Sequence, residues 1–364
     1  MGWNKFASFR KDGGFNKPYI LFKTKNVADS EIRDKKVYKT RPIAPTTKHP
    51  MRTLLRRVGR AWAFVAANME GEHFTLNKCT DVPEFFRETE KKLGKLGEIE
   101  YIIRDIEGCF PNMPKEAIRL ALREEASKRI RMGLNGVYVP KFAMKTPCQW
   151  KYRGSTGKLI WLPFETMIDV MEFALDNAFI MIDGKFHKQI QGIPMGDPLS
   201  PGMTIGTTAW MERLMMDSID YESKKFFTAR RFMDDVLLFY AKTPEWDYER
   251  FLEDFQKSEW YWPPLKLEGD NGDVFLETQF FIENRKIRHR LKNVNEHTKK
   301  VWRYHHYESY SQYQQIKATL IACLWKVQNM ASDDEQLFIS GCAKLKEFEL
   351  LCYPKHLRTY GYVQ

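Results

Sequence analysis

The stretch that decides the fold is RRFMDDVLLFY, residues 230–240. Two apolar arms, Phe232-Met233 and residues 236–239, flank the acidic pair Asp234-Asp235. Apolar arms around a short polar centre predict a β-hairpin with both acids at its turn. Tight hairpin turns favour Asn-Gly or Asp-Gly, so an Asp-Asp pair gives up turn preference in exchange for charge. That exchange indicates chemistry at the turn.

A third carboxylate supports this interpretation. Asp105 lies at the end of EIEYIIRDI, residues 98–106, whose apolar run predicts a buried strand. Carboxylates gathered at strand ends repel one another unless a cation lies between them, and Mg²⁺ prefers such oxygen ligands. Two such ions about 4 Å apart can stabilise both the attacking and the leaving oxygen of a phosphoryl transfer. The alternative is structural: the other acidic pair, Asp333-Asp334, is expected at a helix N-terminus, where acids are favourable without any catalysis.

The composition limits the class of protein. The 364 residues carry 58 Lys and Arg against 47 Asp and Glu, so the formal net charge is +11. With 43% hydrophobic and 29% charged residues the chain is neither disordered nor fibrous. Its length suits about two domains or one multi-lobed enzyme. The basic surplus predicts a polyanionic partner.

Targeting signals are not evident. We find no apolar stretch of 18 residues, and the start of the chain lacks the apolar core of a signal peptide. The six cysteines form no CxxC pair, which favours reduced thiols over disulfides or structural zinc. We therefore expect an intracellular protein, cytoplasmic or nuclear, that does not bind membranes.

The hydrophobic periodicity predicts interleaved strands and helices. Besides the strand at 98–106, we expect strands at 158–162 and 187–193. We expect helices from Arg52 onward, then at 114–132, 164–180, in a segment ending near 218, and at 245–257, 312–330 and 333–351. These elements lack the regular alternation of a doubly wound sheet, so the sequence predicts an α+β fold.

Five motifs, arranged in the family's order, resemble those of reverse transcriptases. FMDD, residues 232–235, resembles the F/Y-x-D-D box of the palm, and DIEGCF, residues 105–110, resembles the palm motif before it. QGIPMGDPLSP, residues 191–201, resembles the loop and helix between them. RPI, residues 41–43, resembles the fingers motif that holds the incoming triphosphate, and VFLE, residues 274–277, resembles the box before the thumb. The resemblance covers most of the chain from about Arg41 onward.

Some of these motifs resemble one branch of the reverse transcriptase family more than the others. The Met-Gly of the middle motif, the FLE box and the tail around His305-His306 are most similar to Penelope-like reverse transcriptases, relatives of telomerase. Two residues depart from the family pattern. Met195 stands where most reverse transcriptases have Gln, and Asp197 stands where a small Ser or Ala is usual. We expect Asp197 to add negative charge beside the substrate.

The resemblance implies a right-hand polymerase: fingers, a palm with a small antiparallel sheet, and a helical thumb. It places an N-terminal extension and the fingers in residues 1–100, the palm in 101–284, and a basic connector and the thumb in 285–364. The implied activity is RNA-directed DNA synthesis with two Mg²⁺ ions, for which Mn²⁺ could substitute. The implied partners are an RNA template, a primer strand, the RNA–DNA duplex and deoxynucleoside triphosphates. A dedicated RNA and an accessory protein are further candidates.

The resemblance also assigns roles to particular residues. Asp105, Asp234, Asp235 and the carbonyl of Ile106 would bind the metal ions, and Lys266 would protonate the leaving pyrophosphate, with Lys257 as a competing candidate. The nucleotide would contact Lys39, Arg41, Phe110, Gly192, Met195 and Gly196. A forked guanidinium suits a phosphate, which favours Arg41. For Lys39, a solvated basic loop is the alternative.

Phe110 is informative about which nucleotide sugar the protein would accept. In the family, an aromatic residue five positions after the first aspartate packs against the sugar and excludes a 2′-hydroxyl, whereas RNA-dependent RNA polymerases carry a polar residue there. Phe110 therefore predicts deoxynucleotide use, although it could simply be a core residue. An RNA-dependent RNA polymerase and a non-catalytic nucleic-acid-binding descendant remain as alternative functions.

A dense basic run precedes the helical tail. We predict that it binds the phosphate backbone of the primer–template, while a solvated hairpin face is the alternative. Its residues are Arg285, Lys286, Arg288, Arg290, Lys292, Lys299, Lys300 and Arg303.

Overall fold

The computed structural model describes residues 2–14, 17–22, 40–142, 146–151, 157–257, 260–269, 272–293 and 303–363. Three residues with predicted roles, Lys39, Lys299 and Lys300, lie outside these ranges. The chain forms two compact units, each built from three separate segments. Unit 1 comprises Met1–Thr75, Ile106–Ser218 and Asp254–Leu267, and unit 2 comprises Leu76–Asp105, Ile219–Glu253 and Glu268–Gln364. Within the described ranges, no helix is both long and apolar enough to cross a bilayer.

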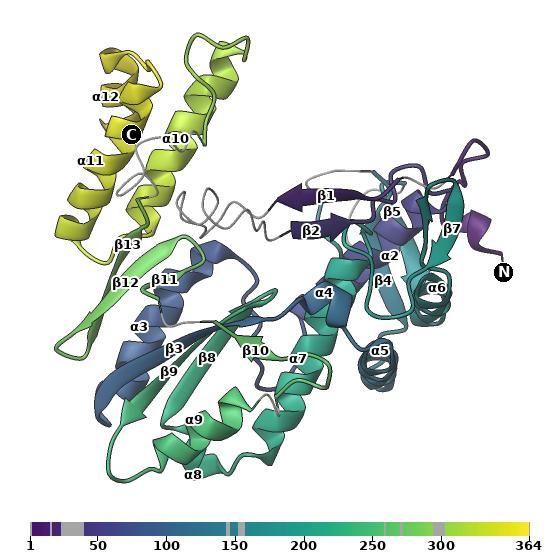
Figure 1. The fold of residues 1–364 in the computed structure, drawn as a ribbon, viewed down its shortest axis with the longest axis horizontal. Helices are drawn as coiled ribbons and strands as arrows, with labels where there is room; N and C mark the ends of the chain where they lie inside the picture. The colour runs from purple at the N-terminus through teal and green to yellow at the C-terminus, as the bar shows by residue number, and fades with distance from the viewer. Residues whose placement is uncertain are drawn as a thin grey trace. The chain divides into compact units, whose positions relative to one another are not determined.

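The main sheet, most of which lies in unit 2, has the strand order β10-β3-β9-β8 (Figure 1), and its β3–β9 and β8–β9 pairs are antiparallel. Its strands are β3 (Glu98–Ile106), β8 (Phe227–Phe232), β9 (Asp235–Lys242) and β10 (Leu267–Glu268). The strand predicted at 98–106 and the hairpin around the acidic pair are thus confirmed. Strand β9 is buried from Val236 to Ala241, because sheet neighbours flank both of its edges and side chains cover both of its faces.

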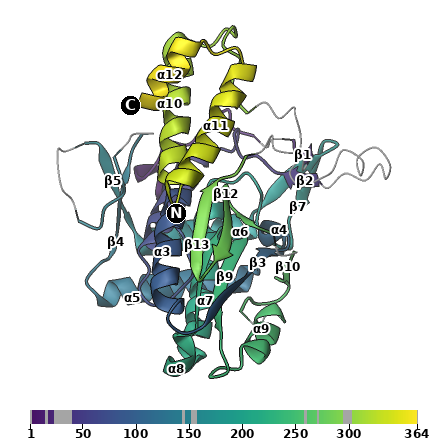
Figure 2. The ribbon, with the colours of Figure 1, turned by 90° about the vertical axis from the view of Figure 1, so that its left-hand side faces the viewer.

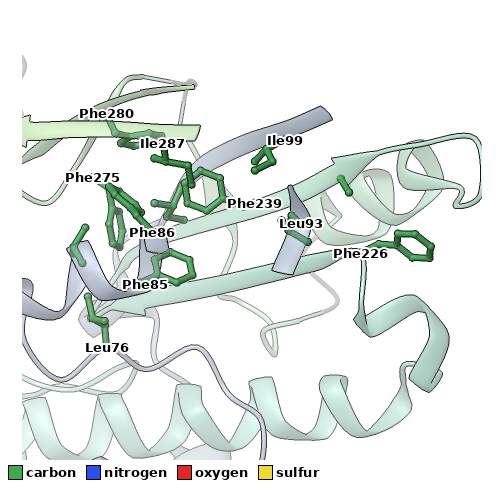
Figure 3. Packing of buried hydrophobic residues seen from close by; sticks show 13 residues of the cluster. Leu76, Phe85, Phe86, Leu93, Ile99, Phe226, Phe239, Phe275, Phe280 and Ile287 are labelled. Atoms are coloured by element: carbon green, nitrogen blue, oxygen red, sulfur yellow. The ribbon is translucent and has the colours of Figure 1, made fainter. Parts of the chain in front are cut away.

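The core of unit 2 joins this sheet to a helix and to a second sheet. Helix α3 (Val82–Leu93) begins with Pro83 in its first turn, where a missing N–H costs nothing. Its Phe86 ring lies 5.7 Å from that of Phe239 on β9 and 5.1 Å from that of Phe280 on the second sheet (Figure 3). The second sheet pairs β11 (Val274–Phe275), β12 (Thr278–Glu283) and β13 (Lys286–Leu291). These aromatic contacts make the two sheets one packing unit.

Three helices form the C-terminal part of unit 2 (Figure 2). They are α10 (Tyr313–Asn329), α11 (Asp334–Leu350) and α12 (Lys355–Val363). Leu320, Leu324, Phe348 and Leu357 are buried between them. The two predicted helices are confirmed to within one residue, whereas the sequence did not indicate α12. The smaller elements of unit 2 are a 3₁₀ turn, η2 (Cys79–Asp81), and α8 (Tyr221–Lys224), while α9 (Tyr248–Gln256) begins in unit 2.

Unit 1 is mainly helical. Its helices are α2 (Arg52–Ala67), α4 (Cys109–Asn112), α5 (Lys115–Arg131), α6 (Phe164–Asp176) and α7 (Ser200–Ser218), preceded by a 3₁₀ turn, η1 (Trp3–Lys5). Helices α2 and α7 pack backbone to backbone, since a Cβ on Gly202 would lie 2.7 Å from the Gly59 carbonyl oxygen. Three two-stranded sheets complete the unit: β1 (Tyr19–Phe22) with β2 (Thr40–Ile43), β4 (Gly136–Pro140) with β5 (Leu159–Pro163), and β6 (Phe179–Ile182) with β7 (Lys185–Lys188).

Two predicted elements of unit 1 were wrong. The helix expected at 164–180 ends at Asp176, and the strand expected at 187–193 lies at Lys185–Lys188 instead. The cause is the dipeptide Asp183-Gly184, in which both residues have positive φ (49° and 75°) and which reverses the chain into the β6–β7 hairpin. Asp-Gly is a strong hairpin signal, and it was present in the sequence.

The aromatic core of unit 2 predicts a large stability cost for Phe239→Ala. Phe239 is fully buried and contacts the rings of Phe85, Phe86, Tyr101 and Phe280. Removing the ring leaves a cavity, so we expect unit 2 to lose about 3–5 kcal/mol of unfolding free energy in urea denaturation. The control is Phe338→Ala on α11, where the side chain is 63% exposed and the expected change is within about 0.5 kcal/mol. Equal losses in the two variants would contradict this description of the core.

Candidate active site

The acidic site of unit 2 is built by strand pairing. In the β3–β9 ladder Asp105 lies directly opposite Asp235, and Asp234 precedes Asp235 in the turn of the β8–β9 hairpin. Side chains directly opposite on antiparallel strands lie on the same face, with Cβ atoms about 5 Å apart. All three carboxylates are partly exposed at the end of the sheet. The structure therefore brings together the three acids that the sequence singled out.

The turn between β8 and β9 is strained. Phe232 pairs with Asp235, so Met233 and Asp234 alone form the turn, and Met233 has a φ of 58°. Two-residue hairpin turns place a glycine at such positions, because a side chain there clashes with the backbone. The left-handed conformation costs roughly 1–2 kcal/mol for any other residue. Strain of this kind persists where the surrounding structure enforces it, and it is concentrated at functional sites.

The donor set suits Mg²⁺. Within the described ranges, no three His, Cys, Asp or Glu side chains form a ready-made metal cage. Mg²⁺ does not require one, since it usually takes one or two carboxylates, retains waters and completes its shell with substrate phosphates. Partly exposed carboxylates on two adjacent strands match that requirement. Asp105, Asp234 and Asp235 are therefore the candidate ligands for a divalent ion, and metal binding by them stays a prediction.

The loop of residues 191–199 in unit 1 brings several predicted nucleotide contacts together. The Ile193 N–H donates a 2.9 Å hydrogen bond to the carbonyl of Phe110, and a Cβ on Gly192 would lie 2.1 Å from the Pro111 carbonyl oxygen. Gly192 has a φ of 67°, so both its backbone angle and its surroundings require glycine. The close backbone approach at Gly192 is therefore made to the Phe110 segment, and the contact of Gly192 with the nucleotide stays a prediction.

The same loop also contacts the end of strand β2. The Ala44 N–H donates a 2.7 Å hydrogen bond to the Met195 carbonyl, and a Cβ on Gly196, with a φ of 109°, would lie 3.1 Å from the Ala44 carbonyl oxygen. Strand β2 carries Arg41, whose side chain is exposed. Backbone contacts therefore join the Phe110 segment, the loop of residues 191–199 and the end of strand β2 within unit 1.

Asp197 has a local structural partner. Its carboxylate accepts a 2.7 Å hydrogen bond from the Leu199 N–H, and its carbonyl accepts one of 3.2 Å from the N–H of Ser200, the first residue of α7. Burial raises the pKa of the Asp197 carboxyl to about 6. Asp197 therefore has hydrogen bonds within its own loop at the start of α7, whereas its position beside the substrate stays a prediction.

The lysine predicted to protonate pyrophosphate lies beside the palm motif of residues 105–110. The carbonyl of Lys266 accepts a 2.8 Å hydrogen bond from the Glu107 N–H, and its side chain is exposed. The competing Lys257 is exposed as well. Neither observation assigns a proton donor, so the role of Lys266 stays a prediction.

The basic run is partly occupied by ion pairs within unit 2. Arg288 contacts Asp333 at 3.1 Å and Glu335 at 2.6 Å, and these carboxylates raise the pKa of its guanidinium. Arg303 contacts Glu277 of the FLE box at 3.4 Å, and Glu277 also pairs with Lys326 of α10. The Arg290 guanidinium lies over the Phe281 ring. These contacts give Arg288, Arg290 and Arg303 structural roles, whereas nucleic-acid binding by the run stays a prediction.

Sequence reasoning missed one residue of the acidic site. Arg231, next to the acidic motif, is fully buried, and its Nη1 donates a 2.9 Å hydrogen bond to the Met233 carbonyl. The available signal was an arginine at a position whose strand neighbours two residues away, Ala229 and Met233, are apolar.

Comparison with known proteins identifies the fold. No family model matches the chain, and no curated protein matches it by sequence. Telomerase from Candida albicans, in complex with a fragment of telomeric RNA, has a similar structure, with a TM-score of 0.59 and 13% identity over 90% of this chain. Apo telomerase from Candida tropicalis gives a TM-score of 0.54 and 14% identity over 95% of this chain. This chain has a right-hand polymerase fold.

The polymerase fold confirms the predicted α+β class. The chain spans only 59% and 58% of the lengths of these two telomerase chains. At such low identity the similarity establishes the fold alone. The fingers, palm and thumb boundaries at residues 100 and 284 stay predictions.

The raised pKa of the Asp197 carboxyl predicts a pH-dependent gain in stability from Asp197→Asn. A carboxyl pKa raised from 3.8 to about 6 means that the folded state disfavours the charged form, so stability is highest below pH 3.8, falls as the pH rises from there to about 6, and then levels off. The asparagine oxygen can still accept from Leu199. We expect urea denaturation to show the variant gaining about 2 kcal/mol relative to wild type between pH 4.5 and pH 7.5.

The matched control for this prediction is Asp220→Asn. Asp220 caps α8 by accepting from the Ser223 N–H, and hydrogen bonds from the Ser223 side chain and backbone lower the pKa of its carboxyl. The opposite direction of the shift means that Asp220→Asn should give no gain at pH 7.5. If Asp197→Asn changes the free energy of unfolding equally at pH 4.5 and pH 7.5, the charged carboxylate does not destabilise the folded protein and the prediction is wrong.

Proposed function

We propose that this protein is an RNA-directed DNA polymerase that extends a primer 3′-hydroxyl with deoxynucleoside triphosphates. The observation that carries the proposal is the position of Asp105 opposite Asp235, with Asp234 in the adjoining turn. Phosphoryl transfer requires positioning and charge neutralisation more than covalent chemistry. A partly exposed group of carboxylates at the end of a sheet would position the metal ions, and those ions would neutralise the charge. The similarity to telomerases supports the choice of an RNA template.

Asp105, Asp234, Asp235 and the Ile106 carbonyl would hold two Mg²⁺ ions, with Mn²⁺ as a substitute. When bound, these ions would lower the pKa of the primer hydroxyl and neutralise the charge that develops on the phosphate. Asp105 and Asp235 reach the site from opposite strands, so the sheet itself sets their separation. Their negative charge also keeps the site from binding a phosphate unless a cation is present.

The residues of unit 1 would handle the nucleotide. Arg41 would pair with the triphosphate through two parallel hydrogen bonds. Phe110 would pack against the sugar, and the loop with Gly192, Met195 and Gly196 would approach the nucleotide through its backbone. Lys266 would give a proton to the departing pyrophosphate. In unit 2 the basic run, with Lys286 and Arg285 exposed, would contact the backbone of the primer–template.

Primer extension by the full chain tests the proposal. With an RNA template, a DNA primer, Mg²⁺ and deoxynucleotides, we expect wild-type extension and a loss of at least about 1,000-fold for Asp234→Asn, because the variant lacks a charged metal ligand. The control is Asp334→Asn, an exposed acid at the N-terminus of α11, which should retain full activity. If Asp234→Asn extends the primer at the wild-type rate, Asp234 is not a metal ligand that the reaction requires. Preferential use of ribonucleotides by the wild type would instead favour an RNA-dependent RNA polymerase.

Phe110 predicts the sugar preference. Replacing the partly exposed ring with Ala opens space for a 2′-hydroxyl, so we expect Phe110→Ala to raise the ratio of ribonucleotide to deoxynucleotide kcat/KM by at least about 10-fold. The control is Phe142→Ala, whose ring is 65% exposed and should leave that ratio unchanged. If Phe110 is only a core residue, the variant will lose stability without any change in the ratio.

A further inference from the structure

The two arginines that precede the acidic turn have opposite environments. The burial of β8 alternates along the strand, so Arg230 is partly exposed while Arg231 has no exposed surface. Arg230 lies over the Phe85 ring and contacts Glu88. Arg231 is among the largest fully buried side chains of the described residues. A guanidinium cannot lose its charge in a protein, so its complete burial is unfavourable unless its N–H groups have partners.

The contacts of Arg231 lead to the acidic turn. Its Nη1 donates a 2.9 Å hydrogen bond to the carbonyl of Met233, the residue with a left-handed backbone. Its own carbonyl accepts a 2.8 Å hydrogen bond from the Leu76 N–H, which fixes the main chain at the base of the guanidinium. The Met233 carbonyl belongs to the peptide plane that joins Met233 to Asp234. Because that plane is rigid, holding its oxygen sets the direction in which Asp234 leaves the turn.

We propose that Arg231 is a positioning residue that holds the strained Met233–Asp234 peptide and thereby aims Asp234 and Asp235 toward the Asp105 side of the sheet. The buried cation also offsets the mutual repulsion of the carboxylates when no metal ion is bound. A lysine could supply the charge but not a planar fork in a fixed orientation. The metal-related part of this inference rests on the proposed function, whereas the conformational part does not.

Hydrogen exchange measures the conformational part directly. In Arg231→Met, an apolar side chain of similar length fills the buried space, and apolar replacement of buried charges is commonly tolerated. We expect the amides of residues 233–235 to exchange at least about 10-fold faster than in wild type, while β3 and the rest of β9 stay protected. Arg230→Met is the matched control, one residue away on the other face of the same strand, and it should leave the turn unchanged. Arg231→Lys should restore part of the protection.

Mn²⁺ binding, followed by the loss of the free-ion signal in electron paramagnetic resonance, measures the metal-related part. With primer–template and a non-hydrolysable nucleotide present, we expect Arg231→Met to weaken Mn²⁺ binding at least about 5-fold and Arg230→Met to leave it unchanged. If the turn of Arg231→Met exchanges faster but the wild-type protein itself binds no Mn²⁺, the positioning role stands and the proposed function is overturned. Turn exchange that matches Arg230→Met, or that rises equally throughout the sheet, would overturn the positioning role.

Discussion

The pairing of β3 with β9 is the constraint on which the rest of the structure depends. Ile102 lies opposite Leu238 and Ile103 opposite Leu237, and the same register places Asp105 opposite Asp235. A slip of one residue would turn every side chain of the strand to the other face. Since Leu237, Phe239 and Ala241 contribute to the core of unit 2, such a slip would remove them from that core. The apolar core thus fixes the register, and the register fixes the carboxylates.

This arrangement explains how the protein tolerates an unfavourable site. Two carboxylates opposite each other, a left-handed Met233 and a buried Arg231 each cost free energy locally. The ring contacts among Phe86, Phe239 and Phe280 lie in the same unit and stabilise the strand that carries the acids. The stability contributed by packing in the middle of β9 therefore offsets the unfavourable conformation of the turn that precedes it.

The sequence predicted elements where local pattern and burial agree. The strand at 98–106 contains the apolar run Tyr101-Ile102-Ile103 shortly before Asp105, and its observed bounds are those expected. The α+β class followed from the order of such elements. The helix expected at 164–180 was too long because apolar residues 178–182 suit a strand as well as a helix. The Asp183-Gly184 turn decides between the two, which shows that turn residues deserve the same weight as periodicity.

The candidate site was predictable only in part, because motif residues are local and their partners are not. The three acids could be identified from two short motifs. The contact between the Ile193 N–H and the Phe110 carbonyl joins segments 83 positions apart, and no pattern in either segment specifies it. The left-handed φ of Met233 was equally hidden, because methionine is not a residue that signals such a turn.

The net charge of the sequence also says little about which basic residues are free to bind a partner. The net charge of +11 predicted a polyanionic partner, but several of the basic residues are used inside the fold. Arg129 pairs with Glu125 at 2.7 Å, Lys344 pairs with Glu347 at 2.6 Å, and all four side chains are buried. Such pairs cannot attract a distant phosphate, because their charges cancel at close range. A nucleic-acid surface must therefore be sought among exposed residues such as Arg41, Arg285 and Lys286, and not inferred from the density of basic residues in the sequence.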